Sequence, residues 1–174
     1  MVKEFNFNES LTIGELGVNI AKSVFRSRYK DIVDYAENRE MQKRGVDIEV
    51  PSLGTVEIKT DKHSDSKFYF ELEVAGKPGG VDRCSADYYC ILFYRQHIMY
   101  LIRRAELQMW LRNHWHWLKT QHPEWLHKTM SIRQDRRWET TGVVVPRELI
   151  MQDLNVAVIN WNEEDEKMQG VKWE

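Results

Sequence analysis

Residues 45–61, GVDIEVPSLGTVEIKTD, decide the predicted fold. Hydrophobic residues alternate with polar ones on both sides of the central PSLG, the pattern of two β-strands joined by a tight turn. Because residues two apart in a strand point to the same side, Glu57 and Lys59 share one face. Asp47 occupies a polar position on the preceding strand. The sequence therefore predicts a hairpin that carries two carboxylates and an ammonium group on polar positions of neighbouring strands.

These are the groups that metal-assisted phosphodiester cleavage requires. Carboxylate oxygens from Asp47 and Glu57 suit a hard divalent cation, and the backbone carbonyl of Ile58 lies between the two charged residues of its strand as a further ligand. Lys59 is placed to position or deprotonate an attacking water. The alternative is an ordinary hairpin with one charged face, since so short a pattern also arises by chance.

The spacing of this motif resembles a known family. Nine residues separate Asp47 from the run Glu57-Ile58-Lys59, which is similar to the metal-binding core of the PD-(D/E)XK nucleases. That superfamily includes restriction endonucleases, recombination exonucleases and Holliday-junction resolvases. Val46 stands where the family pattern usually has proline, so the resemblance depends on D…ExK and its strand context. It implies an α/β fold, with a central mixed β-sheet flanked by helices, and DNA hydrolysis dependent on Mg²⁺ or Mn²⁺.

A predicted helix before the hairpin carries a further candidate, Glu15. Apolar residues recur up to Phe25 with a period near 3.6, and Ser10 or Thr12 is the expected cap. Resolvase-like members of the superfamily are similar in having a glutamate on the first helix, some thirty residues before the aspartate. The resemblance thus implies Glu15 as a catalytic residue beside Asp47. The simpler alternative is that an acidic residue in the first turn suits the positive end of the helix.

Three other polar residues are auxiliary candidates. Gln42 belongs to MQKRGVD, which resembles a Q-x-x-G-[VI]-D phrase of small phage-encoded nucleases of this superfamily. Residues 67–73 read as a strand because of their aromatic content, with Glu71 and Glu73 on the polar face. Either glutamate can assist the metal, and solvation of a sheet edge is the alternative role.

The remaining chain completes one predicted domain. The phrase SADYY at residues 85–89 also resembles those phage nucleases, so the resemblance covers about residues 15–111. Residues 103–119 predict an amphipathic helix, and residues 76–80 a loop. The other expected elements are a strand at 31–36, a hairpin of strands at 87–94 and 98–102, a short helix or loop from 123, and strands at 140–145 and 155–160.

Composition indicates a soluble globular protein. A chain of 174 residues with 42% hydrophobic and 30% charged residues suits one domain. We expect that domain at residues 1–160, with an acidic tail at 161–174 that is either disordered or docks on a partner. No apolar run approaches the ~20 residues that cross a bilayer, and no signal peptide is apparent. Cys84 and Cys90 lack partners at ligand spacing, which predicts free thiols and an intracellular location, in the host cytoplasm for a phage-encoded protein.

The distribution of charge favours DNA as the partner and no membrane. The net charge is -2, but residues 95–137 contain nine Lys/Arg against three Asp/Glu. The alternative is a solvated helix face. Candidate phosphate contacts are Arg26, Arg28 and Lys30 at the end of the first helix, and Arg103, Arg104, Arg112, Arg133, Arg136 and Arg137.

The segment NHWHW at residues 113–117 suggests two other interpretations. His114 and His116 are two apart and so point to different sides of a helix, and no nearby cysteine completes a zinc site, which argues against a histidine-metal nuclease. The tryptophans at 110, 115 and 117 either stack on bases or ribose or belong to the hydrophobic core.

The sequence thus predicts a magnesium-dependent DNA endonuclease with catalytic residues Glu15, Asp47, Glu57 and Lys59. One alternative is a Holliday-junction resolvase or exonuclease of recombination. Another is a DNA-binding or assembly protein that keeps the nuclease fold without turnover. The presence of all four groups favours an active enzyme, and cutting two strands calls for two sites, which favours a homodimer.

Overall fold

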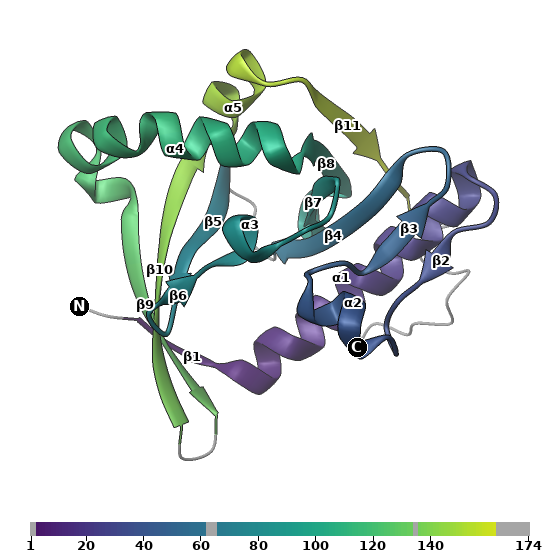
Figure 1. Cartoon of the computed structure of the whole chain (residues 1–174), viewed down its shortest axis with the longest axis horizontal. Helices are drawn as coiled ribbons and strands as arrows, with labels where there is room; N and C mark the ends of the chain where they lie inside the picture. Colours follow the sequence, from purple (N-terminus) through teal and green to yellow (C-terminus); the bar gives the residue numbers. More distant parts are fainter. Residues whose placement is uncertain (1–2, 62–65, 134–135, 163–174) are drawn as a thin grey trace.

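Two β-sheets form the frame of the protein (Figure 1). The computed structural model describes residues 3–61, 66–133 and 136–162. The larger sheet has six strands in the order β11-β8-β7-β4-β3-β2, and the smaller has five in the order β1-β9-β10-β5-β6. The larger sheet is mixed, since β4 and β7 run parallel and its other neighbours antiparallel. The predicted α/β class with a mixed sheet is confirmed, whereas the second sheet was not predicted.

In chain order the elements are β1 (Lys3–Asn6), α1 (Phe7–Arg28), β2 (Val33–Asp34), α2 (Arg39–Lys43), β3 (Ile48–Val50), β4 (Gly54–Asp61), β5 (Lys67–Val74), β6 (Lys77–Pro78), α3 (Gly80–Arg83), β7 (Tyr88–Phe93), the 3₁₀ turn η1 (Tyr94–Gln96), β8 (Ile98–Arg103), α4 (Arg104–Gln121), the 3₁₀ turn η2 (Pro123–Trp125), β9 (Leu126–Arg133), β10 (Arg136–Pro146), α5 (Arg147–Asp153) and β11 (Val156–Asn160).

The predicted hairpin is confirmed as β3 and β4. The two strands are antiparallel, with Ile48 opposite Val56 and Val50 opposite Gly54. The carboxylate of Asp87, just before β7, accepts hydrogen bonds from the backbone N–H of Thr55 at 2.9 Å and from its hydroxyl at 2.8 Å. The turn end of the hairpin is thereby attached to the start of β7, in the SADYY phrase.

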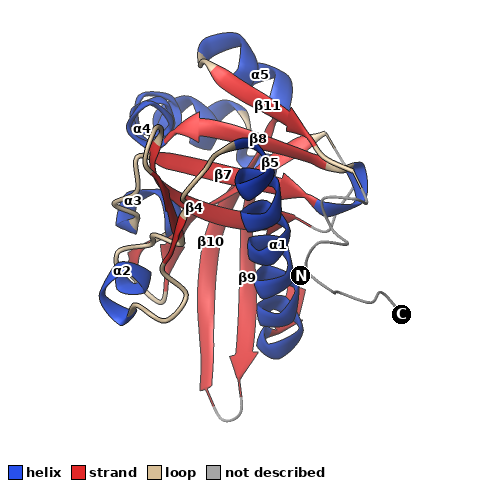
Figure 2. Ribbon diagram, turned by 90° about the vertical axis from the view of Figure 1, so that its right-hand side faces the viewer, coloured by secondary structure: helices blue, strands red, loops and turns tan. Residues whose placement is uncertain are grey.

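The six-stranded sheet is covered on both faces. Helix α1 lies across one face (Figure 2) and packs its apolar side against Val56 and Ile58 of β4. The approach is close: a Cβ on Gly17 would lie 1.8 Å from the Thr60 hydroxyl oxygen, so this position requires glycine. Because strand residues alternate, Glu57 and Lys59 point to the opposite face. That face meets α4 and β5 around a second core, whose buried residues include Phe68, Phe70, Tyr89, Ile91, Phe93, Leu107 and Leu111.

Several predicted boundaries were wrong. Helix α1 begins at Phe7, directly after β1, so Ser10 and Thr12 lie inside the helix and do not cap it. The predicted loop at 76–80 contains the short strand β6, and α3 begins at its last residue. Strand β9 was not predicted, because its polar sequence LHKTMSIR becomes a strand by pairing with β10 and β1. Most of the predicted acidic tail, residues 163–174, lies outside the described residues.

Two smaller observations concern the cysteines and the helices. Cys84 and Cys90 are buried free thiols, and burial raises the pKa of Cys84 to about 11 and that of Cys90 to about 12. Both therefore stay protonated at neutral pH and are not nucleophiles. Among the described residues, no helix combines the length and the apolar character needed to span a membrane.

Candidate active site

Asp47 lies where the β3–β4 ladder ends. Its backbone N–H donates to the Val56 carbonyl at 3.0 Å, and its carboxylate Oδ2 accepts the backbone N–H of Ile58 at 2.7 Å. The carboxylate thus takes the place that a backbone carbonyl would have in a longer ladder. This double attachment holds the carboxylate of Asp47 beside Glu57, the residue between its two backbone partners.

Glu57 and Lys59 form an ion pair on the same face of β4. Glu57 is buried, with 5% of its surface exposed, whereas the Lys59 side chain keeps 38% exposure and so reaches solvent. Gly45 has a positive φ of 66°, and a Cβ there would lie 3.3 Å from Oε2 of Glu57. The absence of a side chain at Gly45 leaves room for the glutamate, whose other oxygen contacts Lys59.

The carboxylates of Asp47 and Glu57 repel each other electrostatically. Burial, followed by the negative charge of Glu57, raises the pKa of Asp47, although the Ile58 N–H and the charge of Lys59 act in the opposite direction. One oxygen of Asp47 accepts the short bond from Ile58, and the other accepts a long bond of 3.4 Å from Gln42. A divalent cation bound between Asp47 and Glu57 would relieve this repulsion.

Asp47, Glu57 and the backbone carbonyl of Ile58 are the groups that could hold a Mg²⁺ or Mn²⁺ ion. Within residues 3–61, 66–133 and 136–162, no group of three or more His, Cys, Asp or Glu side chains is arranged to hold a metal. Mg²⁺ needs no such cluster, because it retains several waters and commonly binds one or two carboxylates together with substrate phosphate. Asp47 and Glu57 supply the carboxylates, and the Ile58 carbonyl remains the candidate backbone ligand.

The surroundings of Lys59 keep it charged. Burial alone would lower the pKa of Lys59, but the negative charge of Glu57, with smaller contributions from Tyr89 and Glu71, raises it well above the ordinary value. Lys59 is therefore an ammonium ion at neutral pH. In this state it can orient a water or stabilise negative charge, but it cannot take a proton.

Glu71 is the auxiliary candidate that the structure brings closest to Lys59. It projects from β5 of the other sheet, and a Cβ on Gly80 would lie 3.5 Å from its Oε2 and 3.0 Å from the Tyr89 hydroxyl. Tyr89, directly opposite Glu57 on β7, was not among the predicted site residues, although it belongs to the SADYY phrase. Its buried phenol and the Glu71 carboxylate complete the wall around the Glu57–Lys59 pair.

The other two auxiliary candidates differ in position. Gln42 donates from Nε2 to the backbone carbonyls of Tyr35 and Val46, both at 3.2 Å, besides its long bond to Asp47. Its role is to hold the chain that leads into Asp47. Glu73 is exposed and lines a neighbouring cavity instead.

The structure does not place Glu15 with the other predicted catalytic residues. Helix α1 covers the face of β4 opposite to Glu57 and Lys59, and Glu15 is exposed. With 3.6 residues per turn, Glu15 lies ~200° around the helix from Gly17, whose backbone contacts the sheet. Glu15 forms no hydrogen bond or ion pair with the described side chains of the hairpin. The resemblance that implied a catalytic role for Glu15 therefore finds no support in this packing.

The predicted basic residues do not form one surface. Arg103, Arg104 and Arg112 belong to β8 and α4, whereas Arg136 and Arg137 are exposed at the far tip of the β9–β10 hairpin (Figure 1). The Arg133 side chain lies outside the described residues.

Several of these arginines already have protein partners. Arg104 donates to the Ala86 carbonyl at 3.1 Å, and Arg112 pairs with Asp82 at 2.8 Å. At the end of α1, Arg28 donates to the Asn160 carbonyl at 2.6 Å, and Arg26 lies 3.8 Å from Asp34. Arg136 and Arg137 are therefore the best candidates for phosphate contacts, because both are exposed. Lys30, beyond the end of α1, is also exposed.

The three tryptophans of α4 have separate roles. Trp110 is buried and donates from its indole to Asp153 at 2.7 Å, and Trp117 packs edge-on against Trp125. Both belong to the packed interior, as one interpretation of the sequence expected. Trp115 is 37% exposed.

Comparisons of the chain with models of protein families, with curated proteins and with solved structures gave no match.

Proposed function

We propose that this protein is a DNA nuclease of the PD-(D/E)XK type that requires a divalent metal ion. The observation that carries the proposal is the meeting of Asp47, Glu57 and Lys59 on two adjacent strands. Asp47 is fixed by the Ile58 N–H and Glu57 by Lys59. Apart from Glu15, these are the residues that the sequence resemblance implies, and they lie in a mixed sheet.

In the proposed reaction, Asp47, Glu57 and the Ile58 carbonyl would hold the metal ion. A bound Mg²⁺ would supply Lewis-acid chemistry at the phosphate. The Lys59 ammonium orients the attacking water and stabilises the negative charge that grows on the phosphate oxygens. Burial of Glu57 keeps the ion pair, and therefore the ammonium group, in one position.

The decisive experiment is incubation of the purified protein with linear, circular and four-way-junction DNA, with and without Mg²⁺. An endonuclease converts circles to linear products, an exonuclease shortens only DNA with ends, and a resolvase cuts the junction. A DNA-binding protein without turnover retards all three and cuts none. Absence of Mg²⁺-dependent cleavage from every substrate contradicts the proposed activity.

Glu71→Gln is expected to reduce cleavage by less than about 10-fold, equivalent to less than ~1.4 kcal/mol in the barrier. The reason is that the charge of Glu71 acts on Lys59, but contributes less than the charge of Glu57 to keeping it an ammonium ion. Glu15→Gln serves as the matched control, since it makes the same chemical change on the opposite face of the sheet, and its rate should equal that of the wild type. Single-turnover rates at saturating Mg²⁺ test the pair. A larger loss in Glu15→Gln than in Glu71→Gln would reverse the assignment.

Replacing Arg136 and Arg137 together with alanine should weaken binding to all DNA sequences alike. Each phosphate contact releases condensed counterions, so the slope of log affinity against log salt is expected to flatten by up to ~0.9 per lost contact. Titrations at several salt concentrations in Ca²⁺, which occupies oxygen sites, measure this slope. An unchanged slope means that DNA lies elsewhere, with the exposed residues at the end of α1 as the next candidates.

A further inference from the structure

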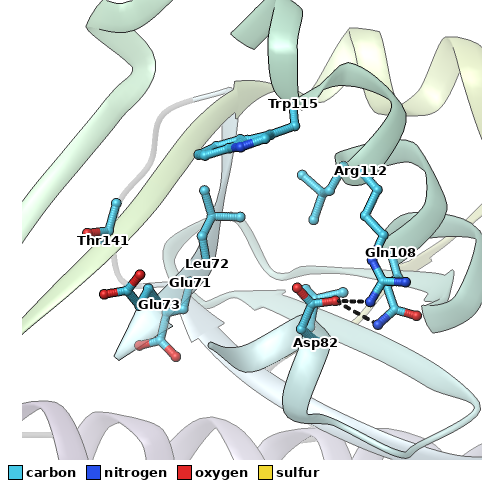
Figure 3. Close-up of a pocket in the computed structure, with 10 residues that line it drawn as sticks. Glu71, Leu72, Glu73, Asp82, Gln108, Arg112, Trp115 and Thr141 are labelled. Carbon is cyan, nitrogen blue, oxygen red and sulfur yellow. Dashed lines mark hydrogen bonds and ion pairs between the residues drawn. The ribbon is translucent and has the colours of Figure 1, made fainter. Parts of the chain in front are cut away.

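A cavity of about 310 Å³ lies beside the candidate active site, between the helices α3 and α4 and the strands β5 and β10 (Figure 3). Its volume is at the lower end of the range for small-molecule sites, ~300–1,000 Å³. Glu71 lines this cavity, and a Cβ on Gly80 would lie 3.5 Å from its Oε2 and 3.0 Å from the hydroxyl of Tyr89, the residue opposite Glu57. A molecule bound there would therefore adjoin the proposed catalytic centre.

Side chains of α4 and β5 form the apolar part of the cavity. Figure 3 shows the Trp115 ring above Leu72, with Leu111 of α4 also in the lining. Trp115 is one of the few large hydrophobic side chains in the described ranges that remain exposed. Lys119, one turn further along α4, lies 5.3 Å from the centroid of the Trp115 ring and packs on it. An indole held in this way at a cavity wall is suited to stacking with a planar ring.

A β-bulge shapes the opposite wall. Thr141 of β10 pairs with Glu73 and Gly142 pairs with Glu71, so Leu72 has no partner on β10. Such an extra residue bends its strand and redirects side chains. In Figure 3 Leu72 points toward Trp115, while the carboxylates of Glu71 and Glu73 point away from it. The bulge thus separates an apolar floor from a polar edge.

The polar edge favours a ligand that donates hydrogen bonds. Glu71, Glu73 and Asp82 supply three carboxylates, against the single guanidinium of Arg112. Arg112 is already paired with Asp82 at 2.8 Å, and Gln108 donates to the same Asp82 oxygen at 2.7 Å. Phosphate would be repelled here, whereas the amino groups of nucleobases donate to carboxylates. A planar, uncharged ring with amino donors matches both walls.

We propose that this cavity receives an unpaired base of the DNA, stacked on Trp115. The substrate class is then DNA with unpaired nucleotides next to the bond that is cut, such as a single strand, a flap or a bubble, in preference to continuous duplex. This proposal rests on the nuclease function proposed above, because it supplies the identity of the ligand.

The test compares binding of three labelled DNAs of the same sequence in Ca²⁺: a single strand, a duplex with a central bubble, and a full duplex. Trp115→Ala is expected to weaken binding to the first two by roughly 5- to 150-fold, the usual effect of losing one base–aromatic stack. Binding to the duplex should not change. Trp115→Phe should restore most of the affinity. Met109→Ala is the matched control, because Met109 is exposed on the same helix and does not line the cavity.

A second substrate isolates the stacking contact. When the unpaired nucleotides are replaced by abasic ones, wild type and Trp115→Ala should bind equally. No loss in Trp115→Ala, an equal loss on duplex, or the same loss on abasic DNA would each overturn the proposal, as would absence of DNA binding by the wild type.

These outcomes are separable from those of the proposed function. A protein that cuts DNA without a Trp115-dependent preference for unpaired bases keeps the nuclease assignment and loses this one. A protein that shows the preference but cuts nothing in Mg²⁺ loses the nuclease assignment and keeps the base site.

Discussion

Lys59→Met is expected to lower the rate of DNA cleavage by roughly 10²–10³-fold, the effect of removing one preorganised charge from a transition state. Lys59 is held as an ammonium ion by Glu57, and methionine has a similar length without the charge. The measurement is the single-turnover rate in Mg²⁺, with DNA affinity in Ca²⁺ determined in parallel. Affinity should change little, because the lost interaction belongs mainly to the transition state.

The same substitution leaves Glu57 buried without its cation. The free energy of unfolding should fall by roughly 1–3 kcal/mol, less than for a fully buried pair because Lys59 is partly exposed and solvent screens it. Lys59→Arg keeps the positive charge beside Glu57 and should recover this stability, but not the full rate, since a guanidinium differs in shape and donor geometry.

Lys128→Met is the matched control for both substitutions. Lys128 of β9 forms an exposed ion pair with Glu139 of β10 at 2.8 Å, in the sheet that does not contain the β3–β4 hairpin. Loss of this ion pair should affect neither the cleavage rate nor the stability appreciably. Cleavage by Lys59→Met at the rate of the wild type would contradict the assignment of Lys59.

Asp47→Asn is expected to abolish Mg²⁺-dependent cleavage and, in the absence of metal, to raise the stability of the fold at neutral pH. Asparagine keeps an oxygen that can accept the Ile58 N–H, but it removes a half-buried negative charge that interacts unfavourably with Glu57. Activity and stability therefore change in opposite directions, as is common where a site stores unfavourable interactions for its function.

The pH dependence follows from the raised pKa of Asp47. The folded state binds the Asp47 proton more tightly than the unfolded state, whose carboxyl titrates near 3.8. This contribution to stability is fully present below that pH and is lost as pH rises through the raised pKa of the folded protein. Urea unfolding of wild type and Asp47→Asn across this window should show the curves diverging as pH rises, with the variant the more stable.

Asp87→Asn is a control for which the expected change in stability has the opposite sign. The hydrogen bond from the Thr55 backbone, followed by the bond from its hydroxyl, lowers the pKa of Asp87. Its stabilising contribution is present above the ordinary pKa and is lost as pH falls, so Asp87→Asn should be less stable than wild type at neutral pH.

Adding Mg²⁺ should raise the melting temperature of the wild type and leave that of Asp47→Asn nearly unchanged, since a ligand stabilises only the state that binds it. Equal shifts in the two proteins would show that the ion binds away from Asp47.

The local alternation of apolar and polar residues was sufficient to predict the β3–β4 hairpin and its polar face. The alternation around Glu57 and Lys59 is a property of the strand itself, and the turn sequence sets the pairing of Ile48 with Val56, so the proximity of Asp47 to Glu57 is predictable from spacing. Local sequence also predicted β5 from its aromatic content, β7 and β8 as continuous apolar strands, and α4 from apolar residues at helical spacing.

Contacts between segments far apart in the sequence decided the positions of the other candidate residues. The order of residues suggested Glu15, but the packing of Gly17 on Thr60 turns Glu15 away from the sheet. A bulge in the pairing of β5 with β10 leaves Leu72 without a partner on β10, between Glu71 and Glu73, and no local signal in residues 67–73 indicates it.

The sequence by itself determined which charges share one face of the β3–β4 hairpin, because side-chain direction in a strand has a period of two. Only the tertiary structure decided that Glu71 and Tyr89 enclose this face, that Trp115 is exposed while Trp110 is buried, and that Glu15 stands apart. Those positions depend on how two sheets and two helices pack, and packing is set by surfaces that meet only in the folded chain.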